Sequence, residues 1–196
     1  MVHLLDIEKY AKDNNVPIML PDGIEFLLNY IKENNVKTIL EIGTAIGYSA
    51  IRMALISSDI KVTTIERDID RYNEAIKNIS DFSLENQINV IYADAFDVDL
   101  SEKFDLIFID AAKSQYIKFF EKFKYNLNET GTIISDNLEF HGLVENKENV
   151  SLSRNVRGLV RKINEYVAFL KDNREFKTDF YSIGDGIGVS VRKSEN

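Results

Sequence analysis

Apolar residues recur along this chain with two different periods. Five short runs rich in β-branched residues occupy residues 37–42, 61–66, 88–93, 104–110 and 131–136. Longer segments between them, such as 48–57 and 70–80, carry apolar residues at helical spacing. Apolar strands that alternate with helices are typical of a parallel sheet covered on both faces. The pattern therefore predicts a doubly wound α/β domain.

The C-terminal part departs from this alternation. Residues 175–183 and 186–193 form two strand-like runs, and Gly184-Asp185-Gly186 between them is a hairpin signal. A phosphate-binding glycine loop precedes a helix rather than a strand, so we interpret these glycines as a turn. We expect a mostly parallel, seven-stranded sheet that ends in an antiparallel hairpin.

Length and composition are those of one globular domain. The 196 residues are 44% hydrophobic and 29% charged and show no repeat or interdomain linker, so we expect a single domain over residues 1–196. The sequence contains no cysteine, which excludes disulfides and thiolate metal sites within it. The first residues lack a signal-like apolar core, and no later run approaches membrane-spanning length. These features predict a cytoplasmic protein that does not associate with membranes.

The balance of charge limits the nucleic acids that the chain can bind. A formal net charge of −8 argues against a DNA-binding protein, because nonspecific affinity for DNA depends on Lys and Arg. One short segment is nevertheless basic, with Arg154, Arg157, Arg161 and Lys162. These residues form either a local RNA-binding patch or an ordinary solvated helix face.

The loop after the first predicted strand is a candidate ligand site. Residues 41–49 connect that strand to a helix, where the first strand of such a sheet meets its ligand. Gly43 allows a tight turn and a close approach of the backbone, although glycines can also serve a turn alone. NAD is disfavoured because the spacing is not G-x-G-x-x-G and Glu41 would repel a phosphate; this acid suits an ammonium group. The candidate contacts in the loop are Glu41, Gly43, Thr44, Tyr48 and Ser49.

Two further strand ends carry candidate contacts. Glu66 ends the second strand, where doubly wound folds place an acid that accepts hydrogen bonds from ribose hydroxyls. The alternative is an ordinary charge at a strand end. Asp94 and Ala95 follow the third strand and are candidates for contact with an adenine edge.

Oxygen ligands follow the fourth and fifth strands. Asp110 ends the run 104–110 with Lys113 three residues later, and Asp136-Asn137 follow the next strand. The carboxyl ends of neighbouring strands are where open α/β sheets bind ligands, and hard oxygen donors suit Mg²⁺. Taken singly, Asp110 can cap a helix and Asp136-Asn137 can form a turn. Taken together, they predict a metal site.

The motifs EIGTAIGYSA, TIERD, FIDAAK and SDN resemble those of the cation-dependent class I O-methyltransferases, the group that includes catechol and caffeoyl-CoA O-methyltransferases. The resemblance covers nearly the whole chain. It implies a Rossmann-like fold, S-adenosylmethionine as the cofactor, Mg²⁺ or Mn²⁺ as the metal, and a homodimer. It further implies Asp110, Asp136 and Asn137 as metal ligands and Lys113 and Asp110 as the catalytic residues. It also implies Asp110 as a cofactor contact, and a helical segment 1–36 that covers the cofactor site with Met19.

The expected chemistry needs two adjacent oxygens in the substrate. A divalent ion that binds both oxygens lowers the pKa of the hydroxyl, and Lys113 either takes its proton or stabilises the resulting oxyanion. The oxyanion then attacks the sulfonium methyl in line, aided by the near-attack geometry in which both are held.

The segments NVPIMLPDGIEFL, SDNLEFHGLV and RNVRGLVRKINEY resemble more narrowly the bacterial tRNA 5-hydroxyuridine methyltransferases, which form 5-methoxyuridine at the wobble position (34). The 5-hydroxyl and C4 carbonyl of that base form a vicinal oxygen pair, as a catechol does. The resemblance implies the tRNA anticodon loop as partner, with Arg154, Arg157, Arg161 and Lys162 on its phosphates. Residues 138–153 are polar and long for a loop and predict a mobile lid over the metal.

The sequence leaves three alternatives open. The first is a small-molecule catechol or phenol O-methyltransferase, which needs an aromatic pocket but no basic patch. The second is a non-catalytic relative that binds RNA or another partner. The third is a dehydrogenase, which would bind NAD in place of S-adenosylmethionine.

Overall fold

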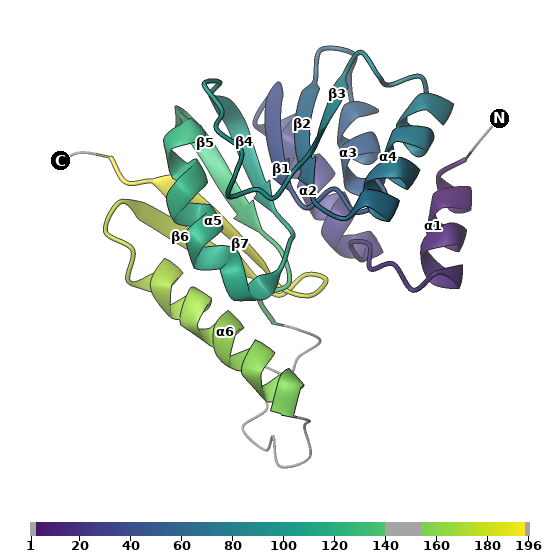
Figure 1. The fold of residues 1–196 in the computed structure, drawn as a ribbon. Helices are drawn as coiled ribbons and strands as arrows, with labels where there is room; N and C mark the ends of the chain where they lie inside the picture. Colours follow the sequence, from purple (N-terminus) through teal and green to yellow (C-terminus); the bar gives the residue numbers. More distant parts are fainter. Residues whose placement is uncertain (1–2, 140–153, 195–196) are drawn as a thin grey trace.

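The computed structural model describes residues 3–139 and 154–194 and contains a seven-stranded sheet in the order β3-β2-β1-β4-β5-β7-β6 (Figure 1). The strands are β1 (Thr38–Ile42), β2 (Lys61–Glu66), β3 (Ile88–Tyr92), β4 (Phe104–Ile109), β5 (Leu127–Ser135), β6 (Phe176–Tyr181) and β7 (Ile187–Arg192). Strands β1 to β5 pair in parallel, and β7 runs antiparallel to both β5 and β6. The predicted Rossmann-like α/β fold with a C-terminal antiparallel hairpin is confirmed.

Helices cover both faces of the sheet. One apolar cluster packs four helices onto one face: α1 (Leu4–Asp13), α2 (Pro21–Glu33), α3 (Tyr48–Ala54) and α4 (Ile69–Asp81). The other cluster packs α5 (Tyr116–Phe123) and α6 (Arg154–Lys171) onto the opposite face (Figure 1). Within β1, Ile39 belongs to the first cluster and Leu40 to the second, as expected for a strand buried on both faces. Short 3₁₀ helices η1 (Lys113–Gln115) and η2 (Lys124–Asn126) flank α5.

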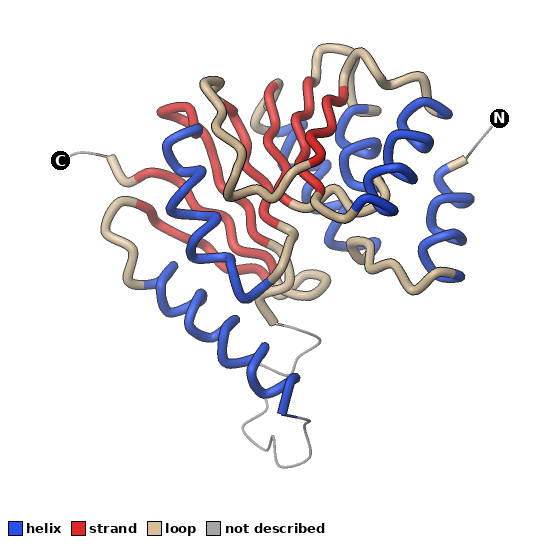
Figure 2. Tube along the Cα trace, in the orientation of Figure 1, coloured by secondary structure: helices blue, strands red, loops and turns tan. Residues whose placement is uncertain are grey.

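The last strand lies inside the sheet rather than at its edge. Strand β7 is mostly buried, whereas β6 exposes most of its residues and carries Lys177 and Asp179, so the charged strand takes the edge. This order brings the hairpin turn beside the segment that follows β5 (Figure 2). There the N–H groups of Leu138 and Glu139 donate to the carbonyls of Gly186 at 2.9 Å and Asp185 at 2.7 Å. A turn close to the C-terminus therefore forms part of the carboxyl edge of the sheet.

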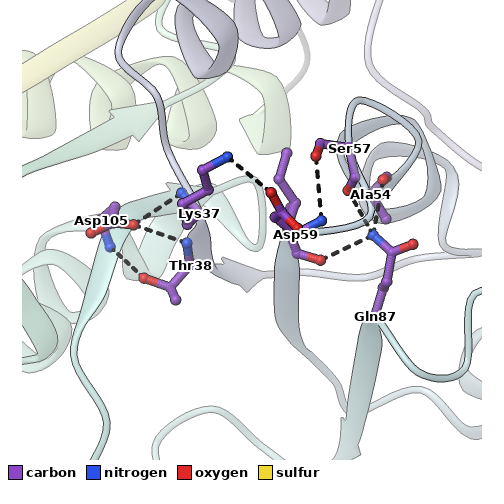
Figure 3. Close-up of polar contacts among 8 residues, drawn as sticks. Lys37, Thr38, Ala54, Ser57, Asp59, Gln87 and Asp105 are labelled. Atoms are coloured by element: carbon purple, nitrogen blue, oxygen red, sulfur yellow. Dashed lines mark hydrogen bonds and ion pairs between the residues drawn. The ribbon is translucent and has the colours of Figure 1, made fainter.

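Polar side chains at the amino edge of the sheet have local structural roles. The Oδ2 atom of Asp105 accepts the N–H groups of Lys37 and Thr38, both at 3.0 Å, and fixes the start of β1 (Figure 3). The Nε2 atom of Gln87 donates to the carbonyls of Ala54, Ser57 and Ile60 at 3.1, 2.9 and 3.0 Å. These hydrogen bonds satisfy backbone groups beside the starts of β1 and β2. Asp105 is therefore part of the scaffold.

The structure bears on two further expectations, which concern membrane-spanning helices and a lid over the metal. Across residues 3–139 and 154–194, the helices are too short or too polar to traverse a lipid bilayer. The predicted lid over residues 138–153 falls outside the described residues except for Leu138 and Glu139, so it stays a prediction.

Candidate active site

A cavity of about 700 Å³ opens at the carboxyl edge of the parallel strands. Strands β1 and β4 lie side by side there, where the strand order reverses, and such a switch point is the usual ligand site of a doubly wound sheet. The volume is in the range of cofactor and small-ligand sites. Twelve predicted residues line the cavity: Met19, Gly43, Thr44, Tyr48, Ser49, Glu66, Asp94, Ala95, Asp110, Lys113, Asp136 and Asn137.

Gly43 holds the loop after β1 against the end of β4. Its φ is +105°, and a Cβ on it would lie 2.1 Å from the carbonyl oxygen of Asp110. The N–H groups of Gly43 and Thr44 both donate to the carbonyl of Ile65, at 3.1 and 3.2 Å. Only glycine fits this position. A Cβ would overlap the adjacent backbone, and a φ of this value is unfavourable for any residue with a side chain. The turn brings the loop and Asp110 together in one wall of the cavity.

Replacing Gly43 with alanine is expected to lower the free energy of unfolding by about 3 kcal/mol and to weaken cofactor binding, since strain and steric overlap act at the same point. Thermal melting and calorimetric titration with S-adenosylhomocysteine measure the two effects. The control is Gly158→Ala in α6, where a Cβ meets nothing within 4 Å and helix propensity predicts stabilisation by about 1 kcal/mol. A Gly43→Ala variant that melts and binds like the wild type would contradict this account.

Glu41 lies behind the lining of the cavity. Its side chain is fully buried and absent from the cavity wall, and its carboxylate accepts hydrogen bonds from Ser49 Oγ and, at 2.6 Å, from Thr64 Oγ1. Thr64 is in turn 2.6 Å from Thr44 Oγ1. The predicted contact of Glu41 with an ammonium group of the cofactor stays a prediction. Glu41 fixes Ser49 and Thr44, which do line the cavity.

Burial is the main reason that the pKa of Glu41 is raised to about 8, since the hydrogen bonds from Ser49 and Thr64 only partly oppose it. The folded chain thus holds a proton that the unfolded chain releases above the ordinary pKa of 4.5. Stability from this group is complete below pH 4.5 and is lost as the pH rises to about 8.

Glu41→Gln is expected to flatten the fall in the free energy of unfolding between pH 5 and 8, which amounts to about 1.4 kcal/mol for each unit of pKa shift. Urea unfolding at a series of pH values, without metal, measures the difference from the wild type. Glu129→Gln, at an exposed position, should leave the wild-type slope in place. Parallel profiles for Glu41→Gln and the wild type would show that Glu41 is ionised in the folded chain.

Glu66 both lines the cavity and shapes it. Its Oε2 atom accepts the N–H of Ala45 at 2.8 Å, and its Oε1 atom accepts the N–H groups of Arg67 and Asp68 at 3.0 and 2.9 Å. These bonds fasten the loop after β1 to the loop after β2. Whether Glu66 also accepts ribose hydroxyls, as the sequence predicts, is not tested by this arrangement.

Asp94 lines the cavity after β3 and is held by two bonds. Its Oδ1 atom accepts the N–H of Phe96 at 3.0 Å, and its Oδ2 atom is 3.3 Å from Arg67 Nη1. The bond from the Phe96 N–H is the main stabilising contact that lowers the pKa of Asp94. Asp94 is therefore a fixed acceptor at the wall of the cavity.

The N-terminal helices are tied to the cavity through Tyr48. Its hydroxyl donates to Glu8 Oε1 of α1 at 2.7 Å and accepts from Arg52 Nη1 at 3.0 Å, and Arg52 forms an ion pair with Glu25 of α2. Met19, 6% exposed, lines the cavity from the connection between α1 and α2. The structure thus places residues of the N-terminal segment at the cavity, while their role in covering a cofactor stays a prediction.

The ends of β4 and β5 bring two carboxylates and an amide together. Asn137 Nδ2 donates to Asp110 Oδ1 at 3.1 Å and to Asp136 Oδ2 at 3.0 Å. Asn137 has a φ of +65°, an uncommon value for a residue other than glycine or asparagine. Asp136 is 3% exposed, and its Oδ1 atom has no hydrogen-bond partner among the described residues. Burial, and then mutual repulsion with Asp110, raises the pKa of Asp136.

These three side chains fit a divalent cation. Burial also raises the pKa of Asp110, and Asp185 adds repulsion that Lys113 opposes. A cation would neutralise the adjacent carboxylates and occupy the unpartnered oxygen of Asp136, and a half-turn of the Asn137 amide presents its oxygen in place of its nitrogen. Oxygen donors of this kind suit Mg²⁺ or Mn²⁺. Among the described residues no group of three or more His, Cys, Asp and Glu side chains is arranged for a metal, so a metal site here would depend on two carboxylates and one amide.

Sequence reasoning did not identify Asp185 as a residue of this cavity. It was assigned to a hairpin turn, which is confirmed by the positive φ values of Gly184 (59°) and Gly186 (85°). Because β7 pairs with β5, the same turn places Asp185 in the cavity wall with Asp136 and Lys113. The available signal was an acid between two glycines, and it acquires a meaning only once the strand order is known.

The four predicted RNA-binding residues lie away from this cavity, on α6. Arg157 and Arg161 line a second, open hollow with Val160, Asn164, Glu165 and Ala168. Glu165 forms ion pairs with Arg161 at 3.7 Å and with Lys162 at 2.7 Å, which reduces their net charge. Helix α6 still carries five basic residues and one acidic residue, and it contacts η1, which holds Lys113. The basic helix therefore neighbours the cavity without lining it.

Comparison with known proteins agrees with this geometry. A family model described as O-methyltransferase matches residues 3–193. The chain belongs to the O-methyltransferase family. It is 29% identical over 193 residues to a caffeoyl-CoA O-methyltransferase of Populus kitakamiensis, covering 94% of this chain and 82% of the relative. It is also 29% identical over 196 residues to a flavonoid 3',5'-methyltransferase of Vitis vinifera, covering 94% and 81%.

Solved structures of family members have the same fold. A Staphylococcus aureus protein provisionally named as a caffeoyl-CoA O-methyltransferase superposes with a TM-score of 0.92 at 38% identity, covering 98% of this chain and 93% of that one. An O-methyltransferase of Bacillus cereus, solved in complex with S-adenosylhomocysteine, superposes with a TM-score of 0.82 at 26% identity, covering 97% and 90%. Both similarities extend over the cavity and the sheet that carries it.

Proposed function

We propose that this O-methyltransferase transfers the methyl group of S-adenosylmethionine to a hydroxyl that has a second oxygen beside it, with the help of a divalent cation. One observation carries the proposal: the loop after β1 and the cluster Asp110, Asp136 and Asn137 line the same cavity. The Bacillus cereus relative with bound S-adenosylhomocysteine supports the cofactor.

The residues divide the cavity between cofactor and cation. Gly43, Thr44 and Ser49 at the β1 loop, Glu66 after β2, and Ala95 with Asp94 after β3 would hold the cofactor. Asp110, Asp136 and Asn137 would hold the cation, which on binding supplies a Lewis acid that lowers the pKa of a bound substrate hydroxyl. Asp110 contributes to both parts, because it follows β4 at the point where the two meet.

Lys113 is the proposed base. It begins η1, three residues after Asp110, and it lines the cavity. Its Nζ atom takes the proton of the substrate hydroxyl, and the resulting oxyanion attacks the methyl carbon as the bond from sulfur to that carbon breaks. The products are a methyl ether and neutral S-adenosylhomocysteine, and the proton stays on Lys113 until solvent removes it.

For the substrate, we propose 5-hydroxyuridine at position 34 of tRNA. The basic helix α6 supports it, because phosphate contacts dominate affinity for RNA, and this helix packs beside the element that carries Lys113. A wobble base is unpaired and can be turned into a cavity, with its 5-hydroxyl and C4 carbonyl as the oxygen pair. On this proposal Arg154, Arg157, Arg161 and Lys162 contact anticodon-loop phosphates.

A small phenolic substrate is the second candidate. The names of the relatives favour it, since they include a caffeoyl-CoA and a flavonoid methyltransferase. The same oxygen chemistry serves a catechol, so the cavity alone does not discriminate between the two substrates.

The decisive experiment incubates the purified chain with methyl-labelled S-adenosylmethionine and Mg²⁺, and either tRNA containing 5-hydroxyuridine or a catechol. Label in the tRNA that disappears with EDTA and returns with Mg²⁺ is the expected result. Charge reversal at Arg157 should weaken binding to tRNA but leave turnover of a catechol unchanged. Label in the catechol only would refute the tRNA substrate, and label in neither would refute the proposed function.

A further inference from the structure

A buried tyrosine on α6 contacts the strand that carries the proposed metal ligands. Tyr166 is 0% exposed, and its hydroxyl lies 2.6 Å from the hydroxyl of Ser135, which is itself 1% exposed. Ser135 is the last residue of β5, directly before Asp136 and Asn137. The hydrogen bond therefore joins the inner face of α6 to the residue from which both proposed ligands emerge.

The side chain of Ser135 points toward α6 because of the alternation along β5. Ile133 packs in the same cluster as Tyr166, whereas Ile134 packs in the cluster on the other face of the sheet. In the backbone, Ser135 is paired with Ile109 of β4 and Gly188 of β7. Only the backbone of Ser135 takes part in strand pairing, so its hydroxyl is available to bond Tyr166.

The segment after Ser135 needs such a restraint. Regular pairing of β5 ends at Ser135, and Asn137 two residues later adopts a φ of +65°. A local conformation of this kind persists only when its surroundings define it. Asp136 is buried in the same segment, so a small rotation at Ser135 would move both proposed donors at once.

We infer that Tyr166 is a positioning residue for the metal site: its hydroxyl holds Ser135, and through Ser135 it sets the positions of Asp136 and Asn137. The inference rests on the proposed function, because it assumes that these two residues bind a cation. Residues that orient metal ligands without touching the metal typically change its affinity by about 10- to 100-fold when removed.

Packing alone is the competing explanation for Tyr166. Its ring contacts Tyr116 edge-on with centroids 5.2 Å apart and stacks on Phe169 at 6.0 Å. Phenylalanine keeps these ring contacts and loses only the hydroxyl, so Tyr166→Phe separates the two roles. Ser135→Ala removes the same bond from the other side and provides a second variant if the first does not fold.

A matched control exists on the same strand. Tyr30 of α2 bonds through its hydroxyl to Thr132 Oγ1 at 2.7 Å, three residues before Ser135 and from the other face of the sheet. Tyr30→Phe therefore removes a bond of the same kind from β5, but away from the proposed ligands. Both tyrosine variants should lose similar thermal stability, and only one should alter the metal site.

The experiment titrates Mn²⁺ into the full chain and follows binding by calorimetry and by the electron paramagnetic resonance spectrum of the ion. Tyr166→Phe and Ser135→Ala should each weaken Mn²⁺ binding by about 10-fold, and the double variant should be no weaker than either single one. Tyr30→Phe should bind Mn²⁺ like the wild type, and S-adenosylhomocysteine affinity should be unchanged in all variants.

The inference would be overturned by wild-type Mn²⁺ affinity in Tyr166→Phe, by equal losses of Mn²⁺ affinity in Tyr30→Phe and Tyr166→Phe, or by additive losses of that affinity in the double variant. Failure of the underlying function has a different signature. In that case either the wild type does not bind Mn²⁺, or Asp136→Asn binds Mn²⁺ as tightly as the wild type does.

Discussion

Replacing Asp136 with asparagine is expected to slow methyl transfer by about 100-fold or more, because an amide cannot supply the negative charge that a divalent cation needs and several kcal/mol of transition-state stabilisation depend on that ion. Steady-state kinetics with saturating Mg²⁺ measure the loss. Affinity for S-adenosylhomocysteine should change little, since the residues proposed to hold the cofactor lie mainly after β1, β2 and β3.

Stability should respond to the same substitution in the opposite direction. Asp136 is buried beside Asp110, and burial, followed by the repulsion from Asp110, raises the pKa of Asp136. Asparagine removes the repulsion, so the metal-free variant should melt at the wild-type temperature or above it. Asp59→Asn, at an exposed acid near the opposite edge of the sheet, is the control and should alter neither activity nor metal binding. Undiminished turnover by Asp136→Asn would refute its role as a ligand.

Replacing Lys113 with methionine is expected to lower kcat by about 100- to 10,000-fold, the usual contribution of a positioned acid or base. Methionine keeps an unbranched apolar side chain of similar length but cannot accept a proton. Lys113 is not one of the proposed metal ligands and its positive charge would repel a cation, so Mn²⁺ binding, followed by calorimetry, should not be weakened.

Lys113→Arg discriminates between a base and a simple positive charge. Arginine keeps the charge but is not deprotonated in proteins, so it should not rescue kcat if Lys113 accepts the proton. Near wild-type kcat in Lys113→Arg would show that a charge at this position is sufficient.

Much of the fold could be predicted because its signals are local. The runs that end at Ile42, Glu66 and Asp110 are short and rich in β-branched residues, as is typical of parallel strands covered on both faces, and the segments between them repeat at helical spacing. The hairpin followed from two glycines around Asp185. The order of β7 and β6 was not predicted, since both runs read as strands and only packing against β5 selects the more buried one for the interior.

The candidate site divides in the same way. Asp110, Lys113, Asp136 and Asn137 could be assigned because the end of a parallel strand predicts where the following side chains gather. The sequence could not predict whether a side chain near a strand end lines the cavity or lies buried behind its wall. Glu41 is one residue before the end of β1, yet it does not line the cavity, because it is buried and bonded to Thr64 and Ser49. Ser49, which it holds, lines the cavity wall.

The sequence by itself thus determined the class of fold, the loop after β1 and the oxygen donors after β4 and β5, because each depends on residues that are close together in the chain. The tertiary structure alone decided that Asp185 enters the cavity, that Glu41 stays out of it, and that Tyr166 reaches Ser135 across 31 positions of sequence. The physical reason is that these three outcomes depend on the order of strands and the packing of a distant helix. Hydrophobic periodicity favours the formation of such elements without specifying their neighbours.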